Sequence, residues 1–584
     1  MKAIRKQRQI IIYFFTQAMI LFSYIANGTS RLCNVSFGGM KIKNEKIVRQ
    51  SYRSMAFATA LSSNAAVRAT VCSLNFPLND SSLLPLNTES LSPDKTFSVY
   101  NPAAPSKTHS SSIIATIPKI IQNKGGGENI SDFVKEAIQR SHEAQLAWRN
   151  TTASHRGSLL RKWSDLIKQH SDDLVTIMTK ESGKTFSESR GEVIYGASFV
   201  DYFSSAAMVS TNNAGGGVVI PTPFVKSDGM SPRGMAIAMK EPVGVAAMIT
   251  PWNFPLAMIT RKAAPALAAG CTAIVKPSEL TPLTAIAVQT LALRAGIPEG
   301  VLQLVISHDR HSSSEVGSTF CTHELVKKIS FTGSTKVGKI LLEQASSTVK
   351  RMSMELGGNA PFIIFHDADI DIAVTAAMKS KFRGAGQTCV CADRFLVHSS
   401  IEEKFVDKLV EAVESIVVGD GTLETTTMGP LITSDAANSV YQKVQEAIQN
   451  GAECVVGGSR IQNLGDNFFE PTVLVNVKPG RDSIWDTETF GPVAAITTFH
   501  TDEEAIRMAN DCSVGLASYI CSGDVGRALS VASRLEAGMV GINEGVISSA
   551  LAPFGGVKES GLGREGSFLG IEEYLQTKYI FLNH

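Results

Sequence analysis

Short apolar runs alternate with longer amphipathic stretches along most of this chain. The short runs are typical of strands buried on both faces, and the amphipathic stretches have the spacing of helices that cover a core. Two long helices are expected first, at about 131–148 and 155–180. The series that follows predicts strands at 244–250, 272–276, 301–306 and 328–331, with helices at 257–269, 283–295 and around 315–322. This alternation predicts a parallel, doubly wound α/β sheet.

A second alternating series follows further along the chain. It predicts strands at 362–365 and 395–398 and helices at 370–382 and 403–417. We therefore expect two α/β domains, formed by 96–223 with 243–357 and by 358–566. Ligands bind such sheets at the carboxyl ends of the strands, so polar residues that directly follow a strand are candidate site residues.

Length and composition narrow the class of protein. A chain of 584 residues exceeds what one hydrophobic core usually supports. A content of 44% hydrophobic and 19% charged residues is typical of a globular protein. The net charge of +1 gives no electrostatic reason to expect a nucleic-acid partner. The nine cysteines lack metal-ligand spacing and a paired histidine cluster, which disfavours a zinc site and a disulfide framework.

The first part of the chain has a different composition. Residues 1–79 contain eleven Lys or Arg and one acidic residue, as is typical of an organellar transit segment. The apolar run Ile10–Ala26 also fits a signal peptide or a marginal membrane helix. We expect import into the mitochondrial matrix; a bipartite signal to a plastid or the secretory route, a start at Met40 or Met55, and a functionally silent extension are the alternatives. We therefore treat 1–95 as a targeting or disordered extension and expect no stable membrane association of the mature protein.

Three polar side chains together suit covalent chemistry at a carbonyl group. Cys389 lies in a run of small residues, where the backbone can turn tightly and leave a thiol accessible. Glu355 directly precedes a Gly-Gly pair, and Asn253 lies in a turn after the apolar run 243–249. Each signal is weak alone, because a single Cys is more often a small buried residue and an Asn between prolines is more often only a turn residue. Together they supply a nucleophile, a base and an oxyanion donor.

These residues lie within a larger set of motifs. The motifs are Pro-Trp-Asn-Phe-Pro (251–255), Lys-Pro-Ser-Glu (276–279), Phe-Thr-Gly-Ser (331–334), Glu-Leu-Gly-Gly (355–358), Gly-Gln-Thr-Cys (386–389), Glu-Thr-Phe-Gly-Pro (488–492) and Pro-Phe-Gly-Gly-Val-Lys-Glu-Ser-Gly (553–561). With them, the chain resembles the aldehyde dehydrogenase family from about Tyr100 to its C-terminus, and most closely its succinate-semialdehyde dehydrogenase branch. The resemblance implies a Rossmann-type NAD-binding domain, an α/β catalytic domain and a small oligomerisation β-element at 224–242 and 567–584. It also implies a homodimer or homotetramer.

The resemblance further implies NAD as the cofactor. It assigns cofactor contacts to Thr250, Trp252, Lys276, Glu279, Gly333, Ser334, Glu488 and Phe490. By itself the segment 333–338 is weak support, because it lacks the full Gly-x-Gly-x-x-Gly pattern. Glu279 favours NAD over NADP, since a carboxylate accepts hydrogen bonds from a ribose 2′-hydroxyl but repels a 2′-phosphate. NADP remains open, because Lys276 can pair with that phosphate.

The family's chemistry, carried onto these residues, is the oxidation of an aldehyde to a carboxylic acid. Cys389 attacks the aldehyde carbon as a thiolate, and the Asn253 amide and the Cys389 backbone N–H hold the oxyanion. Hydride transfer to NAD leaves a thioester on Cys389. Glu355 activates the water that hydrolyses this thioester, so the product is a free acid and not a coenzyme A ester.

Substrate choice depends on a counterion for the substrate's far carboxylate. Arg261, Arg383 and Ser548 match the residues that hold this group in the succinate-semialdehyde branch, and Arg is the side chain best shaped to clamp a carboxylate. Without the resemblance, each Arg is more simply a surface or ion-paired cation. The flank 549–553 and Asp393 depart from the branch, which leaves glutarate semialdehyde or a broad range of aldehydes open. An inactive structural or binding relative is the alternative outside enzymes.

Cys391 forms a Cys-x-Cys pair with Cys389, the only close pair of cysteines in the chain. The same branch has these paired cysteines, which implies that Cys391 is a redox partner of the nucleophile. A disulfide between them needs the loop to rearrange, because residues two apart in an extended segment have poor disulfide geometry. The alternative is that Cys391 is a small buried residue beside the site.

Overall fold

The computed structural model of the protein describes residues 73–74, 78–84, 96–104, 112–118, 130–208 and 216–583. Residues from Ala69 onward form one compact unit. Residues 1–72, which include most of the predicted transit signal and its apolar run Ile10–Ala26, lie outside the described residues. Within the described residues, no helix has the length and apolar character needed to cross a membrane.

The first domain is built on a six-stranded sheet with the order β20-β10-β9-β6-β7-β8. Its strands are β6 (Val245–Ile249), β7 (Thr272–Lys276), β8 (Leu302–Leu304), β9 (Val326–Thr332), β10 (Arg351–Glu355) and β20 (Gly561–Leu562). All neighbours are parallel except β20, which is antiparallel to β10. Every residue of β6 and β7 is buried, as expected for strands covered on both faces. The predicted doubly wound α/β fold is confirmed, although β20 completes this sheet from within the range 358–566.

Most of the helices around this sheet follow the predicted series, but the long helix at 186–206 was not predicted. They are α3 (Ile130–Trp148), α4 (Ala153–Gln169), α5 (Ser171–Ser182), α6 (Phe186–Ala206), α7 (Ala257–Ala269), α8 (Pro282–Ala295), α9 (Arg310–Thr322) and α10 (Thr335–Ala345), with a 3₁₀ turn η4 (Ser346–Thr348). The stretch predicted as one helix at 155–180 is two helices. His170 separates them because its backbone (φ −96°, ψ 24°) leaves the helical conformation, so it ends α4 and begins α5.

The second domain has a seven-stranded sheet with the order β13-β14-β15-β12-β11-β17-β18. Its strands are β11 (Ala360–Ile364), β12 (Ala392–His398), β13 (Glu453–Val456), β14 (Thr472–Val475), β15 (Val493–Phe499), β17 (Ala517–Cys521) and β18 (Met539–Ile542). Its other elements are α11 (Ile370–Lys381), η5 (Arg383–Gly386), α12 (Glu402–Glu414), α13 (Ser434–Gln449), α14 (Ser483–Asp486), α15 (Asp502–Asn510), α16 (Val525–Ala532) and the short pair β16 (Val514–Gly515) and β19 (Val557–Lys558). Only β13 runs antiparallel to its neighbour in this sheet, so the second α/β domain also agrees with the sequence pattern.

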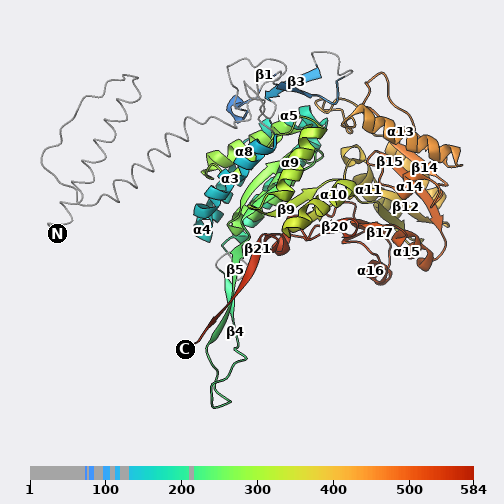
Figure 1. The fold of residues 1–584 in the computed structure, drawn as a ribbon. Coiled ribbons are helices and arrows are strands. Elements are labelled where there is room, and N and C mark those ends of the chain that lie inside the picture. The colour runs from blue at the N-terminus through green and yellow to red at the C-terminus, as the bar shows by residue number, and fades with distance from the viewer. Residues whose placement is uncertain are drawn as a thin grey trace, which may run out of the picture. The chain divides into compact units, whose positions relative to one another are not determined.

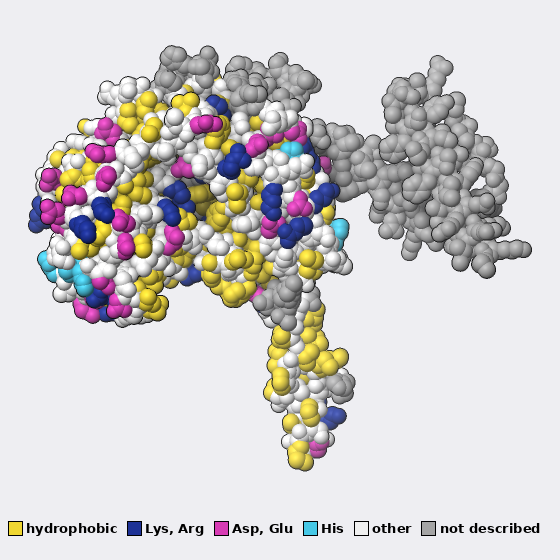
Figure 2. All heavy atoms as spheres, turned by 180° about the vertical axis from the view of Figure 1, so that it is seen from behind, with side chains coloured by type: hydrophobic (Ala, Val, Ile, Leu, Met, Phe, Trp, Pro, Cys, Tyr) yellow, Lys and Arg dark blue, Asp and Glu magenta, His cyan; other side chains and the backbone are white. Residues whose placement is uncertain are grey.

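A three-stranded antiparallel arm extends from the first domain (Figure 1). It consists of β4 (Gly217–Ile220), β5 (Met235–Pro242) and β21 (Leu575–Leu582). Two differences from the expected oligomerisation element are evident: β4 precedes the range 224–242, and α17 (Ser567–Glu572) packs against α7. Figure 2 shows that apolar side chains cover much of the arm, and Val219 is 66% exposed.

The folded part begins earlier in the chain than we expected. Leu83 and Leu84 have no exposed surface and join the core of the first domain through η1 (Ser81–Leu83). The Asp173 carboxylate accepts hydrogen bonds from the backbone N–H groups of Asn79 (2.6 Å) and Asp80 (3.0 Å). A small sheet of β1 (Ser73–Leu74), β3 (Ile113–Pro118) and β2 (Thr96–Tyr100) lies in the same part of the chain. The segment 78–84 therefore differs from the expected targeting extension 1–95.

Candidate active site

Residues at the carboxyl ends of three neighbouring strands meet at one edge of the first sheet. Asn253 follows β6, Lys276 ends β7 and Gly333 follows β9. Glu355 ends the adjacent strand β10, so the candidate base lies at the same edge. The parallel pairing of these strands explains why residues about a hundred positions apart converge here.

The loop that carries Cys389 comes from the second domain and fits closely against the first. Gly386 has φ +74°, and a Cβ atom there would lie 2.1 Å from the Gly491 carbonyl oxygen. Gly358, in the Gly-Gly pair after Glu355, approaches so closely that its Cβ would lie 2.4 Å from the Cys389 carbonyl oxygen. Neither position accepts a side chain without movement of the backbone. The glycine pair after Glu355 thus lets the backbone of the Cys389 loop approach the segment that follows β10.

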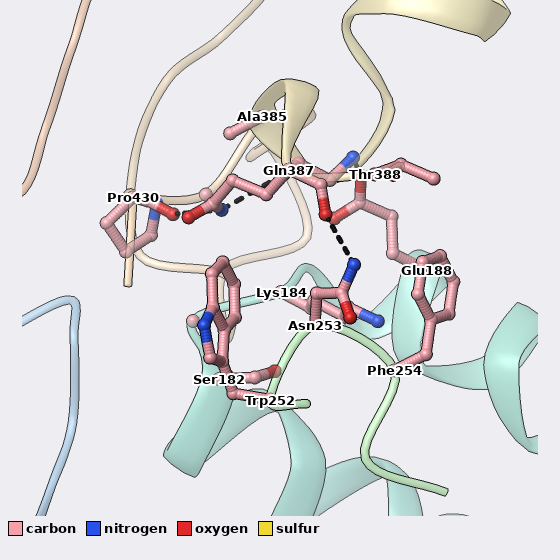
Figure 3. A pocket seen from close by; sticks show the side chains of 13 residues that line it. Ser182, Lys184, Glu188, Trp252, Asn253, Phe254, Ala385, Gln387, Thr388 and Pro430 are labelled. Carbon is pink, nitrogen blue, oxygen red and sulfur yellow. Dashed lines mark hydrogen bonds between the residues drawn. The ribbon is translucent and has the colours of Figure 1, made fainter. Parts of the chain in front are cut away.

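Asn253 contacts this loop directly (Figure 3). Its side-chain Nδ2 donates a hydrogen bond to the backbone carbonyl of Gln387 at 3.0 Å. The Gln387 side chain in turn donates to the Gly384 carbonyl (3.0 Å) and accepts from the Ile432 N–H (2.9 Å). The amide predicted as the oxyanion donor is therefore held two residues from the predicted nucleophile.

Cys389 is partly exposed, but its thiol lies in an environment that disfavours charge. Burial raises the pKa of the Cys389 thiol to about 12; the Arg261 charge opposes this rise, and the Glu488 and Glu355 carboxyls add to it. At neutral pH the thiol therefore holds its proton in this structure. A nucleophilic role requires a base beside it, because the thiolate is the reactive form.

Glu355 has the features of such a base. Its side chain is 2% exposed, and neither carboxylate oxygen has a hydrogen-bond partner among the residues that the structure describes. Burial raises its pKa well above the ordinary value, and the nearby Glu565 charge raises it further, against the charges of Arg261 and Lys262. A buried carboxyl with unpartnered oxygens and a raised pKa is typical of a group that exchanges protons during catalysis.

Glu565 and Lys262 lie beside Glu355 and were not predicted. Lys262 is fully buried and donates hydrogen bonds to the Glu565 carboxylate and, at 3.1 Å, to the Ser330 hydroxyl. Arg261 Nε lies 2.5 Å from the other Glu565 oxygen. Burial acts to raise the pKa of Glu565, but the Lys262 and Arg261 charges outweigh it and lower that pKa. Sequence spacing gave no signal for this network, because Glu565 lies far along the chain from Glu355.

The three predicted substrate residues come together around one hydroxyl group. Tyr195 on α6 has a buried hydroxyl without a completed hydrogen bond. Burial raises its pKa, whereas Arg261, Ser548 and Arg383 lie near enough to oppose the rise. Arg383 Nε is also buried and without a partner. Arg261 has both of the roles considered from the sequence, because it acts on the Tyr195 hydroxyl and its Nε forms an ion pair with Glu565.

The predicted cofactor residues form a continuous set along the sheet edge. Lys276 Nζ lies 3.5 Å from Glu279 Oε2, which also accepts a hydrogen bond from the Ser313 hydroxyl at 3.4 Å. The rings of Trp252 and Phe490 meet edge to face with centroids 5.6 Å apart. The ion pair of buried Lys276 with half-buried Glu279 and the aromatic pair near Asn253 are both compatible with a bound dinucleotide.

The remaining cofactor residues also fit a bound dinucleotide. The buried Thr250 hydroxyl has no hydrogen-bond partner in the described part of the chain, and Ser334 caps α10 through the Val337 N–H. A Cβ at Gly333 would lie 2.5 Å from the Phe331 ring, so glycine is needed where this ring packs against the backbone. Glu488 accepts a hydrogen bond from the Gly358 N–H at 3.3 Å, and burial, with the Asp393 charge, raises its pKa to about 8.

Cys391 is more deeply placed than Cys389. Its side chain is 3% exposed, and its sulfur donates a weak hydrogen bond to the Lys381 carbonyl at 3.8 Å. Lys381 forms a buried ion pair with Asp393, with Nζ 2.6 Å from Oδ1. Asp393, which departs from the branch pattern, is therefore a structural partner of Lys381 beneath the loop.

Comparison with known proteins identifies the family. The model for the "Aldehyde dehydrogenase family" matches residues 123–580. The chain is 47% identical over 470 residues to "Succinate-semialdehyde dehydrogenase [NADP(+)] 1" of Schizosaccharomyces pombe, covering 79% of this chain and 91% of that protein. It is 52% identical over 447 residues to "Succinate-semialdehyde dehydrogenase, mitochondrial" of Homo sapiens, covering 76% and 81%.

Solved structures agree with this match. Succinate-semialdehyde dehydrogenase from Burkholderia pseudomallei is 44% identical with a TM-score of 0.79, covering 87% of this chain and 100% of that chain. Betaine aldehyde dehydrogenase from Staphylococcus aureus in complex with NAD+ is 36% identical with a TM-score of 0.77, covering 85% and 93%. Fold, motifs and relatives agree, and the chain belongs to the aldehyde dehydrogenase family.

Proposed function

We propose that this aldehyde dehydrogenase oxidises succinate semialdehyde to succinate with NAD(P)+, through a thioester on Cys389. The observation that carries the proposal is that Arg261, Arg383 and Ser548, which match the carboxylate-binding residues of this branch, all act on the buried Tyr195 hydroxyl, and that the Arg383 Nε is buried with no hydrogen-bond partner among the described residues. Two guanidinium groups suit the carboxylate at the far end of a short semialdehyde. Relatives named succinate-semialdehyde dehydrogenase, at 47% and 52% identity, support the same substrate.

In the first half of the reaction, Cys389 loses its proton and its sulfur forms a bond with the aldehyde carbon. Glu355 is the buried carboxyl whose charge acts on this thiol, so it can take up the proton. The Asn253 side-chain amide and the Cys389 backbone N–H donate hydrogen bonds to the oxygen, which carries the negative charge. NAD(P)+, when bound, supplies the acceptor for the hydride that leaves the substrate carbon.

In the second half, a water molecule attacks the Cys389 thioester. Glu355 first releases the proton of Cys389 to solvent and then takes a proton from this water, the carbon–sulfur bond breaks and Cys389 leaves as a thiolate. Both Glu355 oxygens lack protein partners, which leaves them available to the water. A base at this position supports a free carboxylic acid as the product.

The proposed cofactor site extends from the adenosine end to the nicotinamide end. Its adenosine ribose would contact Lys276 and Glu279, and its middle would lie over Thr250, Gly333 and Ser334. Its nicotinamide end would lie near Trp252, Glu488 and Phe490. The Glu279 carboxylate favours NAD, whereas the S. pombe relative is named for NADP(+), so both dinucleotides need to be tested.

The test is an assay of reduced cofactor formation by the purified protein. Semialdehydes of about three to six carbons are compared with butanal, with NAD and NADP in parallel. We expect the highest kcat/KM for succinate semialdehyde, because an anionic end group gains hydrogen bonds to two arginines. Equal or higher kcat/KM for butanal would contradict the proposal, and a maximum at glutarate semialdehyde would assign the pocket to the longer substrate.

We also propose that the arm of β4, β5 and β21 packs against a second copy of the chain, in a homodimer or homotetramer. Its exposed apolar side chains support this role, because a surface of this kind is usually covered by a partner. For location, we propose the mitochondrial matrix, supported by the basic composition of residues 1–79 and by relatives named mitochondrial. Import into isolated mitochondria, followed by N-terminal sequencing of the product, tests the location against a plastid.

A further inference from the structure

The first turns of α6 lie between the two loops that carry catalytic groups. Glu192 holds the first loop: its Oε1 accepts hydrogen bonds from the backbone N–H groups of Leu256 (2.9 Å) and Ala257 (3.2 Å). These amides directly follow the turn that contains Asn253. Lys184 forms an ion pair with the other Glu192 oxygen. Glu192 in α6 therefore holds the backbone directly after the turn that contains Asn253.

One turn earlier in α6, Glu188 reaches the second loop. Its Oε2 accepts from the N–H (3.0 Å) and hydroxyl (3.1 Å) of Thr185, which completes a capping box at the N-terminus of α6. Its Oε1 accepts from the backbone N–H of Gly384 at 2.7 Å, 196 residues further along the chain. A capping box needs only the first of these contacts. The contact with Gly384 is therefore additional, and it is a charge-assisted hydrogen bond.

The backbone that Glu188 holds is strained. Gly384 (φ 60°, ψ 28°), Ala385 (φ 54°, ψ 35°) and Gly386 (φ 74°) all adopt the left-handed region. Alanine in this region costs about 1–2 kcal/mol, so surrounding contacts must hold it there. Glu188 accepts a hydrogen bond from the first residue of this turn, Gly384. The Asn253 amide donates one to the Gln387 carbonyl, directly after the turn (Figure 3).

We propose that Glu188 is a positioning residue for Cys389. By holding Gly384 it keeps the left-handed turn in the conformation that presents the Cys389 thiol and backbone N–H to a substrate beside Asn253. Glu188 and Glu192, which both belong to α6, thus hold the two loops that carry the nucleophile and the oxyanion donor. The inference rests on the proposed function, because it takes Cys389 as the nucleophile.

The test compares three variants that separate the helix-cap contact of Glu188 from its contact with Gly384. Glu188→Ala removes both contacts, Thr185→Ala weakens the cap but keeps the Gly384 contact, and Glu188→Gln keeps an oxygen that can accept from Gly384. Three quantities are measured: the rate of the NADH burst, the rate of Cys389 alkylation by iodoacetamide and the thermal midpoint. We expect Glu188→Ala to slow the burst about 10- to 100-fold, as for a displaced catalytic group. Thr185→Ala should change only the midpoint, and Glu188→Gln should restore most of the burst rate.

Two results would overturn the proposal. One is a wild-type burst rate in Glu188→Ala with a midpoint loss equal to that of Thr185→Ala, which would make Glu188 only a helix cap. The other is a burst in Glu188→Gln as slow as in Glu188→Ala. If Glu188→Ala does not fold, Glu188→Leu keeps the bulk of the side chain and takes its place. A burst that persists in Cys389→Ala would instead overturn the proposed function, whatever the Glu188 variants do.

Discussion

At the scale of single residues, the pKa values of two neighbouring buried acids, Glu565 and Glu355, are shifted in opposite directions. Glu565 is paired with Lys262 and Arg261, whose charges lower its pKa against the effect of burial. Glu355 has no hydrogen-bond partner on either oxygen, so burial and the Glu565 charge raise its pKa. The environment thus makes Glu565 a fixed counterion for two cations, and it leaves Glu355 able to gain and lose a proton.

Glu355→Gln should stall the enzyme after hydride transfer, with a burst of about one NADH per active site and slow turnover afterwards. In the wild type, deacylation should speed up as pH rises through the raised pKa of Glu355, because only the ionised carboxylate accepts a proton from water. The variant should lack this pH dependence. Stopped-flow measurement of NADH, with trapping of the thioester for mass spectrometry, checks both expectations; linear progress without a trapped thioester would assign the base elsewhere.

Arg383→Ala should raise KM for succinate semialdehyde about ten- to a hundredfold, the value of a charged hydrogen bond of roughly 1.5–3 kcal/mol. KM for butanal should change little, because butanal has no carboxylate.

Arg261→Ala is the contrasting variant: it also leaves Glu565 with one cation fewer, so it should lower thermal stability and activity on both aldehydes. Steady-state kinetics with both substrates separates the two arginines, and an equal loss on both in Arg383→Ala would mean that Arg383 only supports the loop.

Cys391 is predicted to protect Cys389 during oxidation. Peroxide should inactivate the wild type, and a thiol reductant should restore it, as a disulfide allows and a sulfinic acid does not. Cys391→Ala should keep near-normal activity when reduced but recover less after peroxide, because Cys389 then lacks a resolving thiol. The buried position of Cys391 means that the loop must move before the bond can form. Equal recovery in both proteins would argue for the alternative of a small buried residue.

Much of this site is predictable from sequence because its residues lie in motifs at strand ends. Glu355, Asn253 and Cys389 belong to this group, and their grouping follows from the parallel sheet. Glu188 is different, because a capping box explains its position without any contact to Gly384. Such residues are recognised only when the partner brought close by the fold is known.

At the scale of elements, the N-terminal segment 78–84 gives a test of where the folded chain begins. A protein that starts at residue 78 should keep the thermal midpoint of the longer chain. A protein that starts at residue 96 should unfold earlier, because it loses Leu83 and Leu84, whose burial contributes an upper estimate of roughly 3–6 kcal/mol. Leu83→Ala in the longer protein is the control that separates apolar burial from chain length. Identical midpoints for both truncations would contradict a structural role for η1.

Elements with regular apolar patterns were predicted well, and short ones were not. Strands such as β6 and β7 consist of buried residues throughout and have an unambiguous pattern. By contrast, β20 has two residues, and η1 has three, so neither carries a periodic signal. Their positions depend on distant partners, β10 for the strand and Asp173 for the segment beside η1.

At the scale of the whole molecule, the arm predicts how assembly depends on single surface residues. Val219→Lys should shift the protein to a smaller species, because a charge would be buried in the interface between copies. Val525→Lys is a matched control, since Val525 on α16 is the same residue type with the same 66% exposure but lies outside the arm. Light scattering coupled to size-exclusion chromatography measures the mass. An unchanged mass for Val219→Lys would place the interface elsewhere.

The C-terminal segment also controls when this protein can begin to work. β20, Glu565 and β21 all complete the first domain, although the strands they join, β10 and β5, are made hundreds of residues earlier. Such long-range pairing forms slowly and only after the whole chain is present. A ribosome-bound or partly translocated chain therefore lacks Glu565, the counterion of Lys262. It also lacks β20, an edge strand of the six-stranded sheet, and β21, an edge strand of the arm. We therefore expect a chain that lacks the segment from β20 to β21 to have little dehydrogenase activity, because Lys262 loses its counterion and β10 loses an antiparallel neighbour.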